Sequence, residues 1–540
     1  MADLKLDAVV IGAGVAGIYQ TYQLKEAGLC VRAFDDAADV GGTWFWNRYP
    51  GARFDSEGYI YQYVFDEALY KDWGWSKKFP DQEEIERWFH YVVDRLGVRD
   101  DLQMATRIES AEYHEDTGRW TVRTDRGDVI DAGFLVSCAG MLSAPLTDLF
   151  PGQSDFRGQI FHTSRWPHEG VDFVGKKVAV IGTGATGIQV IQTIAPEVEA
   201  LKVFIRTPQF TLPMKNPTYT EADVKEYHDR FEQIRDSTRK SVVGFENDYL
   251  EFASGQEWAD LTGEQRWEIL EDLYNDGSLK LWVAGFISVF FDPEVSATIS
   301  AFIRSKIVAR LKDPDLIELL VPKPEDFGFG THRVPLECGY YEMFHRENVE
   351  AIGVRDNPIA RIVPEGIELQ DGTVHEADII VMATGFDAGT GALTRLDPKG
   401  RDGRSLAEQW SHEIRSTMGF MVHGYPNMLT TGIPLSPSAA LCNMPTCLQQ
   451  QTEWITGLIT HMRDHGYSVV EPSAEAEAEW VTHHDEVTQA TLLAKTNSWY
   501  NGANVPGKPA GRILSYLGAG DFRERAAELA ASGYKGFQFT

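Results

Sequence analysis

Two stretches of the chain share one pattern: an apolar run, a cluster of glycines, and then apolar residues at helical spacing. The first run covers residues 5–11 and leads into Gly12, Gly14 and Gly17. An uninterrupted apolar run bounded by glycine predicts a strand buried on both faces, as in a parallel sheet. The second stretch repeats the pattern at residues 178–187. Strand, glycine turn and helix in this order predict a dinucleotide-binding unit, so the chain is expected to hold two.

The three glycines of the first unit have different tasks. Gly12 permits a tight turn, Gly14 lets the backbone approach a pyrophosphate, and Gly17 lets the helix pack on the sheet. The next predicted strand, residues 29–34, ends at Asp35. An acid about 20 residues after the first glycine holds a ribose 2′-hydroxyl and would repel a 2′-phosphate. The first unit therefore suits FAD or NAD rather than NADP.

The second unit ends differently. Its next predicted strand, residues 201–205, is followed by Arg206 and Thr207. A cation at the position of the acid accommodates the 2′-phosphate of NADP. The alternative is that Arg206 is only a solvated strand end. The contrast between Asp35 and Arg206 predicts that the two units prefer different dinucleotides.

The segment 41–55 interleaves glycines with aromatic residues and has neither a helical nor a strand period. Ordering so many glycines is entropically costly, so we expect the segment to enclose a bound group whose contacts offset that cost. A flat isoalloxazine ring fits that description. The alternative is an aromatic core loop, which suits Trp46 and Tyr49 but explains the glycines poorly.

Composition changes divide the rest of the chain. A β-rich stretch lies near 105–138, helical spacing dominates 215–320, and short strands near 330–385 end in Ala-Thr-Gly. We predict an α/β fold with two Rossmann-like dinucleotide-binding domains, for FAD and NADP, and a helical insertion. The predicted parts are the FAD domain (1–143), a linker (144–155), the NADP domain (156–214), the helical insertion (215–325), the rest of the NADP domain (326–382), and the rest of the FAD domain with a C-terminal loop (383–540).

Bulk properties exclude several function classes. The 540 residues fit about three domains. A net charge of -30 argues against nucleic acid and anionic membranes, although helix N-termini can still bind anionic cofactors. No apolar stretch approaches the ~20 residues of a membrane span, and nothing resembles a signal peptide. We therefore expect a cytoplasmic protein without nucleic-acid or membrane partners, as a monomer or small homo-oligomer.

The cysteines and charged runs suggest little chemistry. Five cysteines form no C-x-x-C pair, which predicts reduced cytosolic thiols, mostly buried. No H-E-x-x-H motif or Cys/His cluster occurs, so no metal is expected. The acidic run 475–479 is interpreted as a solvated helix face.

Residues 156–167 read Phe-Arg-Gly-Gln-Ile-Phe-His-Thr-Ser-Arg-Trp-Pro. This segment resembles the F-x-G-x-x-x-H-T-x-x-W-P fingerprint of type I Baeyer–Villiger monooxygenases, with every fixed position present. The segment 41–55 matches that family's second pattern, and residues 499–508 extend the resemblance over nearly the whole chain. The chain most resembles the branch that contains phenylacetone and cyclohexanone monooxygenases. The related N-oxygenating enzymes carry Tyr or Phe where Trp166 stands, and His162 is interpreted as a linker element rather than an acid or base.

The resemblance implies an enzyme that uses FAD, NADPH and O2. NADPH reduces the flavin, a C4a-peroxyflavin forms, and its anion attacks a ketone to give a tetrahedral (Criegee) adduct and then an ester or lactone. The 436–444 loop is one residue longer than in comparable relatives, and the stretch 281–291 is apolar. These features favour bulky hydrophobic or cyclic ketones. The resemblance also implies sulfoxidation as a side activity, because the protonated peroxyflavin is an electrophile.

The resemblance also assigns residues. Arg333 is the catalytic cation and Asp55 its partner, although the two could equally form an ordinary structural ion pair. The family often has Lys where His332 stands, which leaves the 2′-phosphate mainly to Arg206 and Thr207. FAD-binding candidates are Gly12, Gly14, Ala16, Gly17, Asp35, Thr43, Trp44, Asp55, Tyr61, Ile108, Met141 and Met444. NADP-binding candidates are Arg53, Gly182, Thr183, Gly184, Thr186, Gly187, Gln189, Arg206, Thr207, His332, Arg333 and Trp499. Substrate-lining candidates are Leu441, Cys442 and Met444.

The sequence raises three other possible functions. A flavin disulfide reductase needs a redox cysteine pair near the first unit, where only Cys30 occurs, so this reading is discounted. An N- or S-oxygenating flavin monooxygenase is compatible with the same motifs. A non-catalytic flavoprotein that senses NADP would bind both cofactors without turnover.

Overall fold

The computed structural model describes the chain except residues 1–3, 439–440, 510 and 513–515. A seven-stranded sheet carries the first glycine turn. Its order is β3-β2-β1-β6-β5-β4, and β17 pairs with β6. The strands β3, β2, β1, β6 and β17 run parallel, whereas β4 and β5 add an antiparallel extension. The strands are β1 (Leu4–Ile11), β2 (Val31–Phe34), β3 (Leu102–Gln103), β4 (Ile108–His114), β5 (Arg119–Thr124), β6 (Val129–Ser137) and β17 (Met428–Thr430).

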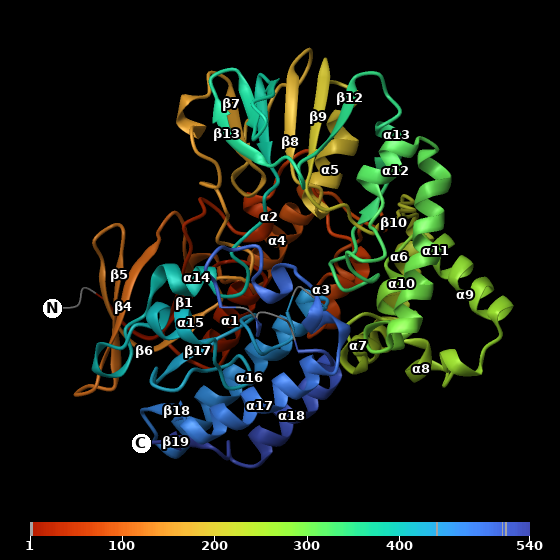
Figure 1. Cartoon of the computed structure of the whole chain (residues 1–540). Coiled ribbons are helices and arrows are strands. Elements are labelled where there is room, and N and C mark those ends of the chain that lie inside the picture. The colour runs from red at the N-terminus through yellow and green to blue at the C-terminus, as the bar shows by residue number, and fades with distance from the viewer. Residues whose placement is uncertain (1–3, 439–440, 510, 513–515) are drawn as a thin grey trace.

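A second sheet carries the second glycine turn. Its order is β12-β9-β8-β16-β7, and all of its pairings are parallel. It lies at the top of Figure 1, away from the first sheet. The β13-β14-β15 meander beside it follows β12 in the chain. The strands are β7 (Gln159–His162), β8 (Lys177–Ile181), β9 (Ala200–Ile205), β12 (Val349–Gly353), β13 (Ile359–Val363), β14 (Gly366–Leu369), β15 (Val374–Glu376) and β16 (Ile379–Met382).

Each turn leads into a helix, as the glycine pattern predicts. Helix α1 (Val15–Glu26) follows β1, and α5 (Ala185–Ile194) follows β8. An added Cβ on Gly17 would lie 1.8 Å from the Gly12 carbonyl oxygen, and one on Gly187 would lie 2.1 Å from that of Gly182. Only glycine lets these helices pack so closely on the turns that precede them.

The predicted helical insertion forms the right-hand side of Figure 1. Two short strands, β10 (Leu212–Pro213) and β11 (Leu336–Glu337), pair where the chain enters and leaves it. Most of the stretch 281–291 lies in its core: Leu281, Trp282 and Phe290 are buried, whereas Phe291 is 40% exposed. The helices are α6 (Glu221–Asp229), α7 (Phe231–Lys240), α8 (Leu250–Ala253), α9 (Gly263–Asn275), α10 (Lys280–Val283), α11 (Pro293–Leu311) and α12 (Pro314–Leu320).

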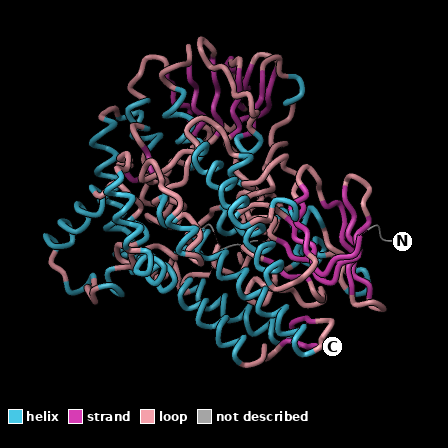
Figure 2. The backbone as a smooth tube through the Cα atoms, turned by 180° about the vertical axis from the view of Figure 1, so that it is seen from behind, coloured by secondary structure: helices cyan, strands magenta, loops and turns pink. Residues whose placement is uncertain are grey.

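The C-terminal part returns to the first sheet. Helix α16 (Met444–His465) packs against α1, and α18 (Ala519–Ala531) packs against α16. Helices α16, α17 (Ala474–Gln489) and α18 lie together at the bottom of Figure 1, and Figure 2 shows this group of helices from behind. Among the described residues, no helix is long and apolar enough to cross a bilayer.

Three expectations need correction. The segment 41–55 contains a short helix, α2 (Thr43–Trp46), directly after Gly42. In the acidic run, Glu475 and Glu479 are exposed, but Glu477 is buried because it faces Arg415 at 3.1 Å. The cysteines are not all reduced thiols, since Cys442 and Cys447 are joined by a disulfide.

Candidate active site

One cavity of about 1710 Å³ lies between the two sheets and reaches both glycine turns. Its wall includes Gly12 and Gly14 from the first turn and Gly182 and Gly184 from the second. The segment 41–55, the residues after β16 and part of the C-terminal loop complete the wall. Nearly all sequence-predicted site residues line it. The three that do not are Gly17, Gly187 and Leu441.

The first turn forms a cradle from which side chains are excluded. Gly12 adopts φ +106°, where L-residues are strained. A Cβ on Gly14 would lie 3.4 Å from Gly42 Cα, so the backbone of the 41–55 segment approaches this turn closely. An unencumbered backbone at a helix N-terminus fits the pyrophosphate of FAD.

The carboxylate of Asp35 lies at the end of β2. Its two oxygens accept hydrogen bonds from the backbone N–H groups of Ala13 at 2.7 Å and Ala37 at 2.8 Å. Burial raises the pKa of Asp35 to about 6. Hydrogen bonds from ribose hydroxyls would favour the charged form, so this carboxylate fits the ribose of FAD.

Aromatic residues cover the flavin side of the cavity. The indole N–H of Trp44 donates to the Tyr61 hydroxyl at 3.1 Å, and the Phe54 ring stacks on Tyr61 with centroids 4.0 Å apart. Thr43 lies beside them in α2. From other elements, Ile108, Met141 and Met444 also line the wall. This packing supports the flat-ring interpretation of the segment 41–55.

The second turn repeats the first with a different rim. Gly182 also adopts φ +106°, and a Cβ on Gly184 would meet nothing within 4 Å. The Thr183 hydroxyl donates to the Thr207 carbonyl at 3.2 Å, while Arg206 is exposed at the cavity rim. An exposed guanidinium beside an open glycine turn fits the 2′-phosphate of NADP.

Gln189 links the two halves of the site. Its side-chain carbonyl accepts from the Tyr49 hydroxyl at 2.8 Å, and its amide nitrogen donates to the Arg53 carbonyl at 3.1 Å. Its side chain thus ties the segment 41–55 to α5. Thr186 lies next to it, 3.5 Å from the Tyr49 hydroxyl. Sequence motifs marked Gln189 as a coenzyme residue but gave no sign of this link, because the partners are more than 100 positions apart.

Arg333 and Asp55 lie together in the cavity wall. The charge of Arg333 lowers the pKa of Asp55, although burial dominates and raises it overall. One Asp55 oxygen accepts from the Leu336 backbone N–H at 3.2 Å, and the guanidinium of Arg333 lies over the Trp282 ring at 5.4 Å. The structure therefore brings the predicted cation and acid into electrostatic contact.

His332 is a neutral group in this site. Its ring stacks on Phe327 with centroids 3.8 Å apart and planes at 4°. Burial lowers its pKa to about 4. A neutral imidazole supplies no positive charge here, so binding of a 2′-phosphate by Arg206 and Thr207 stays the prediction.

Two further residues were missed by sequence motifs. Arg165, at an unfixed position of the 156–167 fingerprint, stacks over Trp46 at 3.9 Å and lies 3.8 Å from Asp36. Arg395 also lines the cavity. The place of Arg165 in the fingerprint could have drawn attention to it, whereas no sequence motif marks Arg395.

Two of the three predicted substrate-lining residues lie in the cavity wall. Cys442 and Met444 line the cavity, whereas Leu441 is buried behind it. Of the stretch 281–291, no residue reaches the wall. Most of that stretch is core, and it approaches the cavity only where Trp282 lies behind Arg333, so its apolar character does not indicate substrate size.

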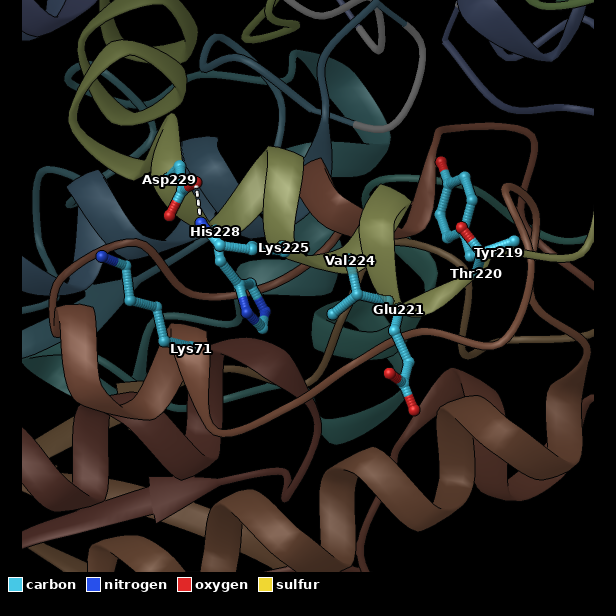
Figure 3. Close-up of a pocket in the computed structure, with 8 residues that line it drawn as sticks. All are labelled: Lys71, Tyr219, Thr220, Glu221, Val224, Lys225, His228 and Asp229. Carbon is cyan, nitrogen blue, oxygen red and sulfur yellow. Dashed lines mark hydrogen bonds and ion pairs between the residues drawn. The ribbon is translucent and has the colours of Figure 1, made fainter.

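A second, shallower hollow of about 470 Å³ lies between α3 (Glu67–Lys71) and α6. Figure 3 shows its residues, among them the ion pair of Lys225 and Asp229 on one helix face. It shares no residue with the large cavity. Within the described part of the chain, no cluster of His, Cys, Asp or Glu could hold a metal ion.

Comparison with known proteins agrees with this geometry. Residues 5–216 match the family model "Flavin-binding monooxygenase-like". Acetone monooxygenase (methyl acetate-forming) from Gordonia sp. is 62% identical, over 99% of each chain. Phenazine N-monooxygenase from Lysobacter antibioticus is 37% identical, over 98% of this chain and 96% of the relative. The crystal structure of OTEMO in complex with FAD and NADP superimposes with a TM-score of 0.94 at 36% identity, over 99% of each chain.

The family match, together with two glycine turns that face one cavity, identifies the chain as a flavin-binding monooxygenase. Within that class, the chain belongs to the Baeyer–Villiger monooxygenases. The predicted family, fold and pair of cofactors, FAD and NADP, are confirmed.

Proposed function

We infer that the protein converts ketones into esters or lactones with NADPH and O2. In the balanced reaction, ketone, O2, NADPH and a proton give ester, NADP⁺ and water. The observation that carries this proposal is the single cavity that holds both glycine turns and Arg333. A site built in this way brings two dinucleotides and a fixed positive charge to one place.

The chain's main contribution to the chemistry is Arg333. Bound FAD, reduced by NADPH, supplies the activation of O2. A guanidinium ~4 Å from an anionic oxygen stabilises it by about 4 kcal/mol at an effective dielectric constant of ~20. That corresponds to roughly three pKa units, enough to keep a reactive oxygen deprotonated near neutral pH. The same charge stabilises the oxyanion that develops on the ketone oxygen.

Asp55 is the positioning partner in this proposal. Its hydrogen bond to the Leu336 N–H anchors the carboxylate beside the strand that follows Arg333. A buried carboxylate near a guanidinium keeps that cation in place and in its charged form.

Coenzyme choice rests on the rim of the second turn. Arg206 and Thr207 would bind the 2′-phosphate of NADPH, while His332 stays neutral. Location in the cytoplasm and a monomeric or small homo-oligomeric state stay predictions from the sequence.

Substrate size is the finer question. The 62% identical relative forms methyl acetate from acetone, which makes short acyclic ketones the first candidates for this chain. The longer 436–444 loop, of which residues 439–440 lie outside the described residues, still predicts bulky or cyclic ketones. Sulfoxidation stays a predicted side activity. Both predictions are open to one assay.

The second candidate function is N- or S-oxygenation, favoured by the similarity to a phenazine N-monooxygenase. The test is a panel of acetone, cyclohexanone, an aryl ketone, a sulfide and a phenazine, each scored by product structure. Ester or lactone formation supports the proposal. Oxygenation of only the sulfide or phenazine favours the alternative, and no substrate-stimulated NADPH oxidation points to a non-catalytic flavoprotein.

A further inference from the structure

The C-terminal loop is fastened to the cavity by a buried lysine. The Lys508 ammonium donates to the Asp387 carboxylate at 2.5 Å and to the Ala388 carbonyl at 2.7 Å. The Lys508 side chain is only 8% exposed and that of Asp387 21%. Most surface ion pairs are exposed and contribute little, whereas a buried, doubly bonded ammonium is costly to release.

The segment that accepts these hydrogen bonds, Asp387 and Ala388, is itself attached to the cavity wall. The backbone N–H of Asp387 donates to the Ala144 carbonyl at 2.8 Å, and that of Gly389 donates to the Met141 carbonyl at 2.9 Å. Met141, Ala144 and Ala388 all line the cavity. The segment that receives Lys508 is therefore fixed to the flavin side of the site.

A chain of turns connects Lys508 to Trp499. The Gly502 N–H donates to the Trp499 carbonyl at 3.1 Å, and the Val505 N–H donates to the Gly502 carbonyl at 3.1 Å. The Lys508 N–H then donates to the Val505 carbonyl at 3.3 Å. Each turn begins where the previous one ends, so hydrogen-bonded turns connect Lys508 to Trp499 without a break.

A second contact lies midway along the loop. The Asn504 side-chain amide donates to the Phe386 carbonyl at 2.8 Å, and both residues line the cavity. At the other end, Trp499 lines the cavity while its neighbour Tyr500 is fully buried near Arg333, whose charge lowers the Tyr500 pKa against the effect of burial. The loop thus spans from the flavin-side anchor to the catalytic cation.

We propose that Lys508 is a positioning residue, which latches the C-terminal loop to Asp387 and so holds Trp499 and Tyr500 over the Arg333 end of the cavity. The latch itself is independent of the proposed function, and only its effect on catalysis rests on that function. A closed loop keeps water from the reacting oxygen, so a loose one should divert NADPH oxidation from ester formation to release of H2O2. In that side reaction NADPH, O2 and a proton give NADP⁺ and H2O2.

The test compares Lys508→Met, which removes the ammonium, with Lys508→Arg, which retains a cation. Lys495→Met serves as the matched control, because Lys495 is exposed on the same part of the chain. The readouts are hydrogen–deuterium exchange of residues 497–508 in the FAD-loaded protein with NADP⁺, flavin reduction rate, and the ester to H2O2 ratio.

In Lys508→Met, exchange of the loop should rise roughly tenfold or more, since charged hydrogen bonds are lost. The ester to H2O2 ratio should fall while flavin reduction keeps its rate, and Lys508→Arg should restore much of both. The proposal is overturned if Lys508→Met shows the same loop exchange and the same ester to H2O2 ratio as wild type. If no ketone is oxygenated even by wild type, the exchange measurement still decides about the latch, independently of the proposed function.

Discussion

The carboxylate of Asp55 accepts a hydrogen bond from the backbone N–H of Leu336 at 3.2 Å. This bond joins the end of the 41–55 segment to the strand that follows Arg333. Two motifs 281 positions apart in the chain thus meet at one point of the cavity wall. Their meeting gives the proposed chemistry its geometric basis.

Loss of the Arg333 charge should stop oxygenation but not flavin reduction. We expect Arg333→Ala to reduce ester formation about 10²- to 10³-fold, the usual effect of removing an oxyanion-stabilising donor. Flavin reduction by NADPH, followed by stopped-flow absorbance, should persist. Arg333→Lys should retain partial activity, because it keeps charge but loses the planar fork. Ester formation at near-native rate in the Ala variant would remove Arg333 from the mechanism.

Loss of the Arg206 side chain should change coenzyme preference. A charged hydrogen bond contributes about 1.5–3 kcal/mol, so Arg206→Ala should weaken NADPH roughly 10- to 100-fold and NADH far less. The measurement is KM for each coenzyme. Lys202→Ala is the control, since Lys202 lies on β9, the strand that Arg206 directly follows, but outside the cavity wall. Equal losses for NADPH and NADH would mean that Arg206 does not bind the 2′-phosphate.

Two buried histidines predict loss of stability in acid. Burial lowers the pKa of both His162 and His332 from 6.5 to about 4. As pH falls below 6.5, the unfolded chain takes up protons that the folded protein refuses, so the free energy of unfolding decreases. Each histidine contributes a slope of at most about 1.36 kcal/mol per pH unit down to the folded pKa.

The check is urea unfolding of the FAD-loaded protein at several pH values between 7 and 4.5. His332→Phe keeps the stack on Phe327 and removes the titrating group, so its slope should be shallower than that of wild type. A slope unchanged by this substitution would show that His332 protonates as easily in the folded protein as in the unfolded chain.

The acidic run offers a prediction with its own controls. Glu477 accepts from Arg415 and, at 2.9 Å, from the His423 backbone N–H. Glu477→Ala leaves both donors without their buried acceptor and should lower the free energy of unfolding by about 3 kcal/mol. The controls are Glu475→Ala and Glu479→Ala, at exposed positions of the same run. Each should change the free energy of unfolding by no more than about 0.5 kcal/mol. The measurement is chemical denaturation. Equal losses of unfolding free energy in all three variants would contradict the buried ion pair of Glu477.

The sequence by itself determined the class of this protein. The glycine turns, Asp35 and Arg206 act through short-range spacing, because a strand, a turn and a helix form from neighbouring residues. Local pattern was therefore enough to predict both dinucleotide units, their cofactors and the family. It also marked Arg333 and Asp55, though only by resemblance.

Tertiary structure decided which distant groups meet. The hydrogen bonds of Gln189 to Tyr49 and of Lys508 to Asp387 join residues more than 100 positions apart. No local sequence pattern indicates such pairs. Packing also buried Glu477 within a run that looked solvated, and it placed most of the 281–291 stretch in the core instead of the cavity. The physical reason is that burial and long-range pairing depend on which surfaces face each other after folding, and residue spacing along the chain carries no record of that.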